Sequence, residues 1–279
     1  MATPEDDPWN FWVFSVSARG GFNGESTFKG NDVSGSFSAN RVTEEWKVRL
    51  SLSTRYNQSD YDYEDYSTTS VRRDHTLSGE LVKSLGPRWS AGLKSSVRHS
   101  TYYNFDVAAT LAPLLEYNFY PYSESTRRIL TLQYALEAGY YDYRAKTVFL
   151  KEEETVGSQS LTLSLSLRQP WGSASTSFQA AHFLHDIDLH HLNLFGSLNF
   201  RLARGLSLNV FGSVGRIQDR ISVGYEDATT EELLLRRRLL ETDYQYFTSI
   251  GLTYRFGSIF NNVVNPRMGG GGGGMIIMM

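Results

Sequence analysis

Apolar and polar residues alternate one by one in about twelve segments of this chain, and this pattern predicts its architecture. Side chains of a β-strand point in turn to opposite faces, so each segment has one apolar and one polar face. The clearest segments are residues 46–56, 130–141, 160–168, 191–202, 206–214 and 243–256, and weaker ones are residues 11–23, 28–42, 71–85, 88–103, 106–120 and 173–185. Pro113 lies inside a weaker segment, where its missing N–H predicts a bulge or an irregular strand. The pattern predicts an all-β fold.

The connections between the segments also alternate in length. Those after every second segment are short, whereas residues 57–70, 144–157 and 217–240 are long and polar. Short turns at one end and long loops at the other are typical of membrane barrels, so we predict a transmembrane antiparallel up-and-down β-barrel of about 12 strands. The barrel takes residues 10–256, between an N-terminal segment (1–9) and a C-terminal tail (257–279). An even number of strands puts both termini on the short-turn, periplasmic side.

The tryptophans support the same orientation. Each lies at or just before the start of an alternate segment, and in a barrel they come together at one end. Indole rings prefer the membrane interface because the ring is apolar and its N–H needs a polar partner. We predict an interface aromatic ring made of Trp12, Trp46, Trp89 and Trp171, with Trp9 beside it.

A soluble all-β sandwich or barrel is the alternative, since its strands also alternate. That fold would fill its core from the apolar faces and expose long polar strands dominated by serine, threonine, asparagine, arginine and glycine. The membrane barrel accounts better for twelve such strands and for the clustered tryptophans.

The last segment ends in a pattern of polar residue, glycine and two aromatics. Ser249, Gly251, Tyr254 and Phe256 occupy these positions. They resemble the C-terminal signal by which bacterial outer-membrane barrels are recognised for insertion, so we expect the outer-membrane insertion machinery as a partner. Some twenty residues follow Phe256, which departs from barrels that stop at the final aromatic.

Composition agrees with an envelope protein and excludes several other classes. The formal net charge is −3, so no basic field recruits nucleic acid, and the chain has no cysteine for a disulfide or thiol chemistry. No apolar run reaches the roughly 18 residues of a membrane helix. The acidic start at residues 1–7 does not have the pattern of a signal peptide, so we expect the mature form of an exported protein, with Met1 either native or added.

With its strands placed, the chain resembles the family of salt-induced outer membrane proteins, a bacterial group that carries a domain of unknown function. The likeness rests on four stretches within residues 10–256: the glycine-rich residues 18–23, the strand led by Trp46, residues 117–123, and the closing residues 251–256. The resemblance implies a barrel in the outer membrane of a Gram-negative bacterium, surrounded by membrane lipid. It names no solute.

Charged side chains on the polar faces are the candidate functional residues. In a barrel they would line the lumen, where they must pair or meet water. The basic ones are Arg19, Lys47, Arg49, Arg55, Lys94, Arg98, Arg168, Arg201 and Arg255, and the acidic ones are Asp74, Glu80, Glu116, Glu137 and Asp243. Two alternatives stay open: a narrow water-filled pore with an anion bias, or a lumen closed by ion pairs. A barrel of twelve strands is intermediate in width between the small barrels that side chains fill and the wide barrels that hold an open channel.

We expect no enzyme, cofactor or metal. An outer-membrane phospholipase would need a histidine and a serine two apart on one strand face, and the nearest match, His99-Ser100-Thr101, offers only threonine at that spacing. The His/Asp cluster at 182–191 and the acidic run at 57–66 could hold a metal ion, but solvated loops explain both more simply. His182 is expected to face lipid beside a loop and to reach the headgroups.

The interpretation of two features, one before the last strand and one after it, stays open. Residues 229–232 resemble a capping box before an Arg-rich stretch, which predicts either a helical tip that narrows the pore or strands that extend beyond the membrane. The tail carries six glycines before a Met/Ile end. This end is either disordered or cloning-derived, or it is an apolar plug that docks on a periplasmic or envelope protein or enters the lumen from below. We predict a passive channel for small polar or anionic solutes, with a closed docking barrel as the alternative.

Overall fold

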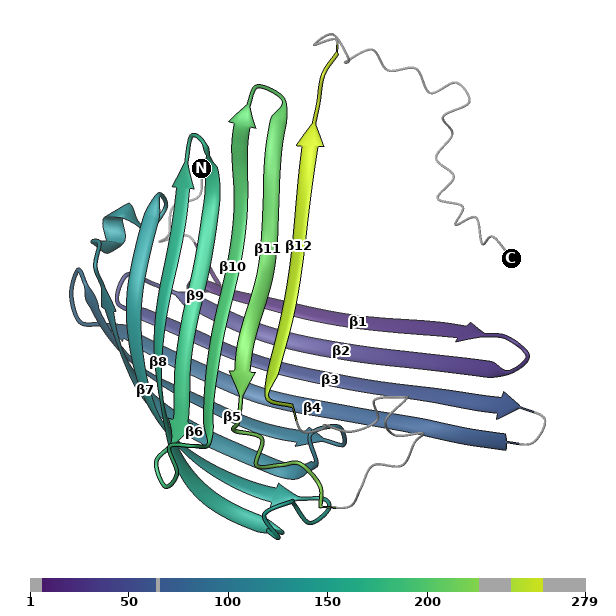
Figure 1. The fold of residues 1–279 in the computed structure, drawn as a ribbon. Coiled ribbons are helices and arrows are strands. Elements are labelled where there is room, and N and C mark those ends of the chain that lie inside the picture. The colour runs from purple at the N-terminus through teal and green to yellow at the C-terminus, as the bar shows by residue number, and fades with distance from the viewer. Residues whose placement is uncertain (1–6, 64–65, 226–241, 258–279) are drawn as a thin grey trace.

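The computed structural model describes residues 7–63, 66–225 and 242–257, and they form one antiparallel meander (Figure 1). The twelve strands follow one another in space in chain order, so the predicted up-and-down topology is confirmed. The strands are β1 (Trp12–Gly24), β2 (Phe28–Val42), β3 (Trp46–Tyr63), β4 (Tyr66–Ser84), β5 (Trp89–Ser100), β6 (Phe105–Asn118), β7 (Arg128–Tyr143), β8 (Glu153–Gln169), β9 (Gly172–Phe183), β10 (His190–Ala203), β11 (Leu206–Ile217) and β12 (Tyr244–Tyr254). A 3-10 turn, η2 (Tyr122–Glu124), lies between β6 and β7.

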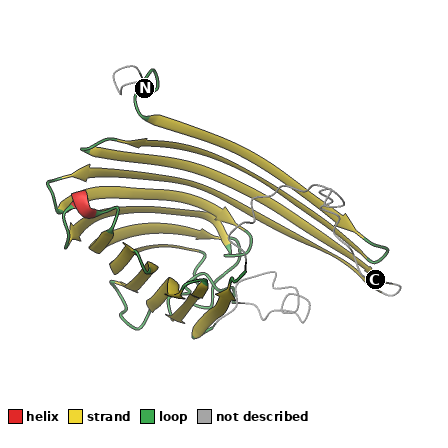
Figure 2. Cartoon of the chain, turned by 90° about the horizontal axis from the view of Figure 1, so that it is seen from above, coloured by secondary structure: helices red, strands yellow, loops and turns green. Residues whose placement is uncertain are grey.

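The sheet is curved but not closed. It arches from β1 to β12 (Figures 1 and 2), and β1 pairs only with β2 while β12 pairs only with β11 in the described part of the chain. Both edges therefore keep unpaired backbone groups. Because the number of strands is even, β1 begins and β12 ends at the same end of the sheet, next to the turns that join β2 to β3 and β10 to β11.

The two faces of the sheet have opposite chemistry, as the alternation predicts. The convex face carries large apolar side chains that are open to their surroundings, such as Leu161, Leu163 and Leu194, which are 45%, 41% and 45% exposed. The concave face carries serine, threonine, asparagine and charge. Serines meet across strands there, with 2.8 Å between the Oγ atoms of Ser17 and Ser36.

Only a small core is buried among the described residues, and apart from Ala39, which lies between Phe14 and Leu50 on the convex face, it lies on the concave side. Part of it is on β6, where Ala108, Ala112 and Leu114 are buried while their convex neighbours stay exposed. The rest lies where loops fold inward, among Tyr143, Phe183, Ile217, Ile221 and Val223. The sheet alone therefore does not bury its apolar side chains, unlike a soluble sandwich.

Residues 57–63 and 66–70 are strand rather than the predicted loop. β3 continues to Tyr63 and β4 begins at Tyr66, with Asp60 opposite Thr69 in the same ladder. Tyrosine, serine and threonine at alternate positions suit a strand, and the polar residues between them misled the sequence interpretation. The loop predicted over 144–157 is likewise shorter, since β8 already begins at Glu153.

Pro113 interrupts the sheet without a bulge. It faces Leu93 in β5, but the pairing with β7 stops after Leu111 and resumes at Leu114 in the same register. The missing N–H thus removes a ladder bond, as expected, and the strand is irregular at this point. A register shift between Phe105 and Val107 makes β6 irregular at its start as well.

Two sequence predictions lie outside the described residues: the capping box and Arg-rich stretch within 226–241, and the tail from residue 258. Within the described ranges, no helix is long and apolar enough to cross a membrane.

Candidate functional site on the concave face

Glu80 is the centre of an ion-pair cluster on the concave face. The strand register sets it between Arg49 of β3 and Lys94 of β5. Its Oε2 atom lies 3.4 Å from Lys47 Nζ and 3.5 Å from Arg49 Nη1, and its Oε1 atom lies 4.0 Å from Lys94 Nζ. The Glu80 side chain is only 16% exposed, so one partly buried carboxylate serves three cations.

Hydrogen bonds extend this cluster across the next strands. Lys94 Nζ donates to Gln133 Oε1 at 3.3 Å, and Gln133 Nε2 donates to Glu116 Oε2 at 3.2 Å. Tyr122, on the η2 turn, donates its hydroxyl to Glu116 Oε1 at 3.2 Å and lies 2.9 Å from Ser90 Oγ. Burial raises the pKa of the Tyr122 hydroxyl, so it stays a donor near neutral pH. The η2 turn is thereby fixed onto the concave face.

A second cluster surrounds Asp74 nearer the opposite end. Arg98 Nη2 and Arg72 Nε lie 3.5 Å and 3.1 Å from its carboxylate, and Ser100 donates its hydroxyl to Oδ1. The two guanidinium groups stack over Tyr103 and Tyr102, 4.1 Å and 4.0 Å from the ring centroids. Arginine suits this arrangement because its planar group stacks and donates at once.

The predicted charged residues divide into paired and unpaired groups. Arg55 Nε lies 4.0 Å from Asp32 Oδ2. Glu137 lies opposite Ser158 and lines the cavity on the concave side that is described below. Asp243 immediately precedes β12, and its carbonyl accepts a backbone bond from Ile217. The described residues give no ion pair to the side chains of four arginines: Arg19, Arg168, Arg201 and Arg255.

Three of these arginines, Arg168, Arg201 and Arg255, make the short-turn end of the concave face basic, whereas Arg19 lies in the middle of β1. Arg168 faces Ser173 across the β8–β9 ladder, and Arg201 faces Ser207 across β10–β11. Hydroxyl groups there cannot neutralise a guanidinium group. An anion that enters from this end would therefore meet uncompensated positive charge.

We expect Glu80→Gln to lower the free energy of unfolding by roughly 1–3 kcal/mol, because it leaves three cations close together without their carboxylate. Urea unfolding of the detergent-folded protein measures this change. Glu45→Gln is the matched control, since Glu45 is exposed in the turn before β3 and should change stability little. Equal effects of the two substitutions would remove Glu80 as the centre of the cluster.

Asn104 joins three loops at the end away from the termini. Its side-chain nitrogen donates to the carbonyls of Ala145 and Ser222 at 2.7 Å and 3.1 Å, and its Oδ1 accepts from the Ala145 N–H at 2.9 Å. Its φ of 63° is a left-handed conformation, which asparagine tolerates better than most residues. The loops after β5, β7 and β11 are thus tied together by one residue.

Residues 218–225 pass over the concave face to reach that contact. Val148 N–H donates to the Val223 carbonyl at 2.8 Å, and Tyr225 N–H donates to that of Lys146 at 2.8 Å. Together with strand residues of β8, β9 and β10, this segment lines a cavity of about 690 Å³ on the concave side. The loop after β11 therefore covers part of the face that would line a lumen.

Three phenylalanines on the concave face were missed by the sequence analysis. Phe195, Phe211 and Phe247 form a row across β10, β11 and β12, with ring centroids 5.4 Å and 5.7 Å apart. Each phenylalanine occupies a polar-face position in the one-by-one alternation of its strand. An aromatic residue at such a position in three successive strands was the signal in the sequence.

The tryptophans lie where the sequence placed them along the chain. β1, β3 and β5 begin at Trp12, Trp46 and Trp89, and Trp171 lies in the turn before β9. Lys83 Nζ lies 5.1 Å from the Trp46 ring, and Trp171 packs against Phe200 at 5.4 Å. The first contact puts an ammonium group beside an indole ring, and the second pairs two aromatic rings at the same end of the sheet. The interface role stays a prediction.

The end of the terminal strand presents its aromatic residues outward. Ser249 and Gly251 lie on the concave face of β12, whereas Tyr254 lies on the convex face and stacks with Phe256 at 5.2 Å. Phe256 is 83% exposed at the free edge of the sheet. An insertion factor could reach these side chains, and their role as a signal stays a prediction.

Neither metal nor nucleophile chemistry gains support among the described side chains. They contain no group of three or more histidine, cysteine, aspartate or glutamate residues placed to hold a metal ion. Asp60 instead accepts hydrogen bonds from Gln58 and Thr69. His99 stacks with His75 on the convex face, whereas Ser100 points to Asp74 on the concave face, so these neighbours do not form a base and nucleophile.

No protein-family model matches the chain, and no curated protein is significantly similar to it.

Proposed function

We propose that this sheet is the wall of an outer-membrane β-barrel in a Gram-negative bacterium. The observation that carries the proposal is the belt of exposed apolar side chains on the convex face, opposite a polar concave face. Apolar patches beyond a few hundred Å² mark binding or membrane surfaces. The belt includes side chains from the first strand to the last, such as Val16, Leu52, Leu93, Leu163 and Ile250.

Closure of the barrel requires β1 to pair with β12. Both strands have a free edge and similar lengths of 13 and 11 residues, and their places as first and last of twelve alternating strands would make them antiparallel neighbours on closure. Open edges cost several kcal/mol per unpaired group in lipid, which favours closure in a bilayer. The termini would then lie on the periplasmic side, and the closing residues 249–256 would be available to the insertion machinery.

Within that barrel we infer a narrow passive channel for small polar or anionic solutes. The unpaired arginines at the short-turn end supply the anion preference, and the polar side chains above them replace part of the water around a passing solute. The paired clusters around Glu80 and Asp74 stiffen one side of the wall.

A closed lumen is the second candidate, and the position of residues 218–225 favours it. This segment lies over the concave face at the end opposite the termini and is tied to the loop after β7. The protein would then act as a structural or docking barrel that binds envelope proteins through its loops or its tail.

Single-channel recording in planar bilayers separates the two candidates. Pure, folded protein should give discrete conductance steps with a preference for anions. Complete absence of steps would refute the channel and leave the docking barrel.

We expect Arg201→Glu to shift the selectivity of these steps toward cations, because Arg201 has no carboxylate partner among the described residues and a charge reversal there acts on the passing ion. Reversal potentials in a salt gradient measure the shift. Arg204→Glu is the control, because Arg204 lies in the exposed β10–β11 turn and carries the same change in charge. Equal shifts for both variants would exclude Arg201 from the conduction path.

A further inference from the structure

The cavity on the concave side has the size and the enclosure of a ligand site. Its volume of about 690 Å³ lies within the range of roughly 300–1,000 Å³ that is usual for small-molecule sites. Part of the segment 218–225 lies over it, and the concave faces of β7, β8 and β9 form its floor. The cavity extends from the loops at the end opposite the termini toward the middle of the strands.

Two rows of side chains across β7, β8 and β9 shape this floor. The rows are Ala135, Ser160 and Ala181 and, two positions nearer the short-turn end, Gln133, Thr162 and Gln179. The small side chains of the first row leave space above them. The second row presents two amides and a hydroxyl group to that space.

The polar row has hydrogen-bonding groups that no protein atom uses. Gln133 accepts from Lys94 with its Oε1 and donates one hydrogen of its Nε2 to Glu116, so its second amide hydrogen is left over. The side chains of Thr162 and Gln179 have no hydrogen-bond partner among the described residues. Hydroxyl and amide groups each offer a donor and an acceptor, so this row can bond to a ligand that does the same.

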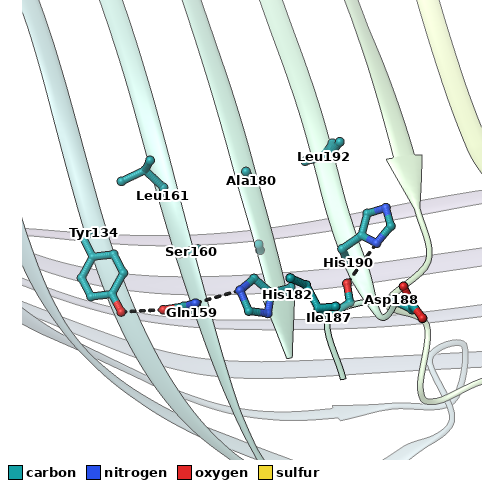
Figure 3. A pocket seen from close by; sticks show the side chains of 11 residues that line it. Tyr134, Gln159, Ser160, Leu161, Ala180, His182, Ile187, Asp188, His190 and Leu192 are labelled. Atoms are coloured by element: carbon teal, nitrogen blue, oxygen red, sulfur yellow. Dashed lines mark hydrogen bonds between the residues drawn. The ribbon is translucent and has the colours of Figure 1, made fainter. Parts of the chain in front are cut away.

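The hollow on the convex face differs in this respect (Figure 3). Its polar side chains bond to one another: Tyr134 donates its hydroxyl to Gln159 Oε1 at 2.7 Å, and Gln159 Nε2 lies 2.7 Å from His182 Nε2. Most of its remaining lining is apolar. The unused polar groups therefore point to the concave cavity as the site for a polar ligand.

Aromatic rings line the same cavity near the loops. They belong to Tyr102, Tyr103, Phe105 and Tyr141. Phe105 and Tyr141 stack with 5.5 Å between their ring centroids. Aromatic rings offer an apolar surface against which C–H groups pack. A ligand that uses both parts of the lining must combine C–H surface with many hydroxyl groups.

The phenylalanine row of β10, β11 and β12 continues the aromatic surface toward the short-turn end. Gln245 of β12 lines the cavity, and Phe247 follows two positions later on the same face. His191 of β10 also lines the cavity, and Phe195 lies four positions further along. A solute that leaves the cavity in this direction would again meet aromatic rings.

The formal charges in the lining balance one another. Lys94 and Arg220 are positive, and Glu137 and Asp219 are negative. An anionic ligand would therefore gain no net attraction in the cavity, in contrast to the basic short-turn end. The charge balance favours a neutral ligand.

We propose that this cavity binds a neutral pyranose sugar. The C–H groups on one face of the sugar ring pack against the aromatic side chains, and its hydroxyl groups bond to Gln133, Thr162 and Gln179. A sugar hydroxyl donates and accepts at once, which matches the amide and hydroxyl groups of the floor. The inference rests on the proposed barrel and channel, and it names the class of solute that the channel carries.

Saturation-transfer NMR of the full chain, folded in a detergent without a sugar headgroup, tests the proposal. We expect saturable binding of glucose, with saturation reaching its ring C–H protons. Glucuronate, which has the same ring with a carboxylate, should bind several-fold more weakly. Glycine, a small zwitterion, should not displace glucose. Equal binding of glucose and glucuronate, or displacement of glucose by glycine, would overturn the assignment to a neutral sugar.

Two substitutions in β9 locate the binding site. Gln179→Leu removes an amide with little change in volume and should weaken glucose binding roughly tenfold, the equivalent of about one hydrogen bond. Ala181→Leu fills the space above the floor and should weaken binding by a similar factor. Heat-modifiable migration in detergent gels shows which variants are folded.

Asn193→Leu is the matched control for Gln179→Leu. Asn193 lies opposite Gln179 on the concave face of β10 and is not part of the cavity lining, so its loss should leave glucose binding unchanged. Wild-type affinity in both folded β9 variants, or an equal loss in Asn193→Leu, would refute the site.

Failure of the proposed channel gives a different result. If planar-bilayer recordings show conductance steps but the protein does not bind glucose, only the sugar site is refuted. If the protein binds glucose but shows no steps, the channel is refuted and the site belongs to a closed barrel. If both the site and the channel exist, added glucose should lower the single-channel current in a saturable manner.

Discussion

Replacing Leu163 with arginine should prevent most of the chain from folding into a bilayer. Leu163 lies on the convex face of β8, opposite Leu132 and Phe178, and is 41% exposed. A guanidinium group at the midplane of a membrane barrel costs about 2–4 kcal/mol, because it leaves water for hydrocarbon. Urea titration in lipid vesicles measures this loss, and the folded fraction is seen as heat-modifiable migration in detergent gels.

The neighbouring residue provides the control. Thr162→Arg places the same side chain one position away on the concave face, where other arginines already lie. This variant should lose far less folding free energy than Leu163→Arg. If both substitutions cost the same free energy, the convex face would not be in contact with lipid, and a soluble sheet with another partner on that face would explain the structure better.

Replacing Ile221 with aspartate should raise single-channel conductance several-fold. Ile221 is 6% exposed, within the segment that lies over the concave face. An unpaired carboxylate at a buried position costs several kcal/mol, so the segment should leave the face rather than bury the charge. The cavity below it would then open to water, and planar-bilayer recordings report the change.

Ile187→Asp is the matched substitution at the same end of the sheet. Ile187 lies in the loop between β9 and β10 and is 70% exposed, so its carboxylate meets water and should leave conductance unchanged. An Ile221→Asp channel with wild-type conductance would show that residues 218–225 do not limit the path. If the wild-type protein gives no conductance steps and the Ile221→Asp variant does, the result would support the docking barrel with a closed lumen.

The strands could be predicted closely from the sequence because their signal is local. One-by-one alternation in residues 160–168 or 191–202 needs no distant contact to be seen, and it correctly assigned an apolar and a polar face to these strands. The error at residues 57–70 has a local cause as well. Polar residues on both faces of a strand remove the alternation of hydrophobicity, so the end of β3 looked like a loop.

The charged cluster could be predicted only as a set of residues on one face. That Glu80 meets Lys47, Arg49 and Lys94 depends on the register of three strands, and a shift by two residues would keep every side chain on its face while changing the partners. The unpaired state of Arg168 and Arg201 depends on register in the same way.

The sequence by itself determined about twelve strands and the chemistry of their faces, because a period of two is a property of the chain alone, and the alternating lengths of the connections indicated the strand order. Only the tertiary structure decided which charges pair, how residues 218–225 cross the concave face, and that Tyr134, Gln159 and His182 form one chain on the convex face. Each of these features joins residues from different strands or loops, and their spacing along the chain says nothing about their distance in space.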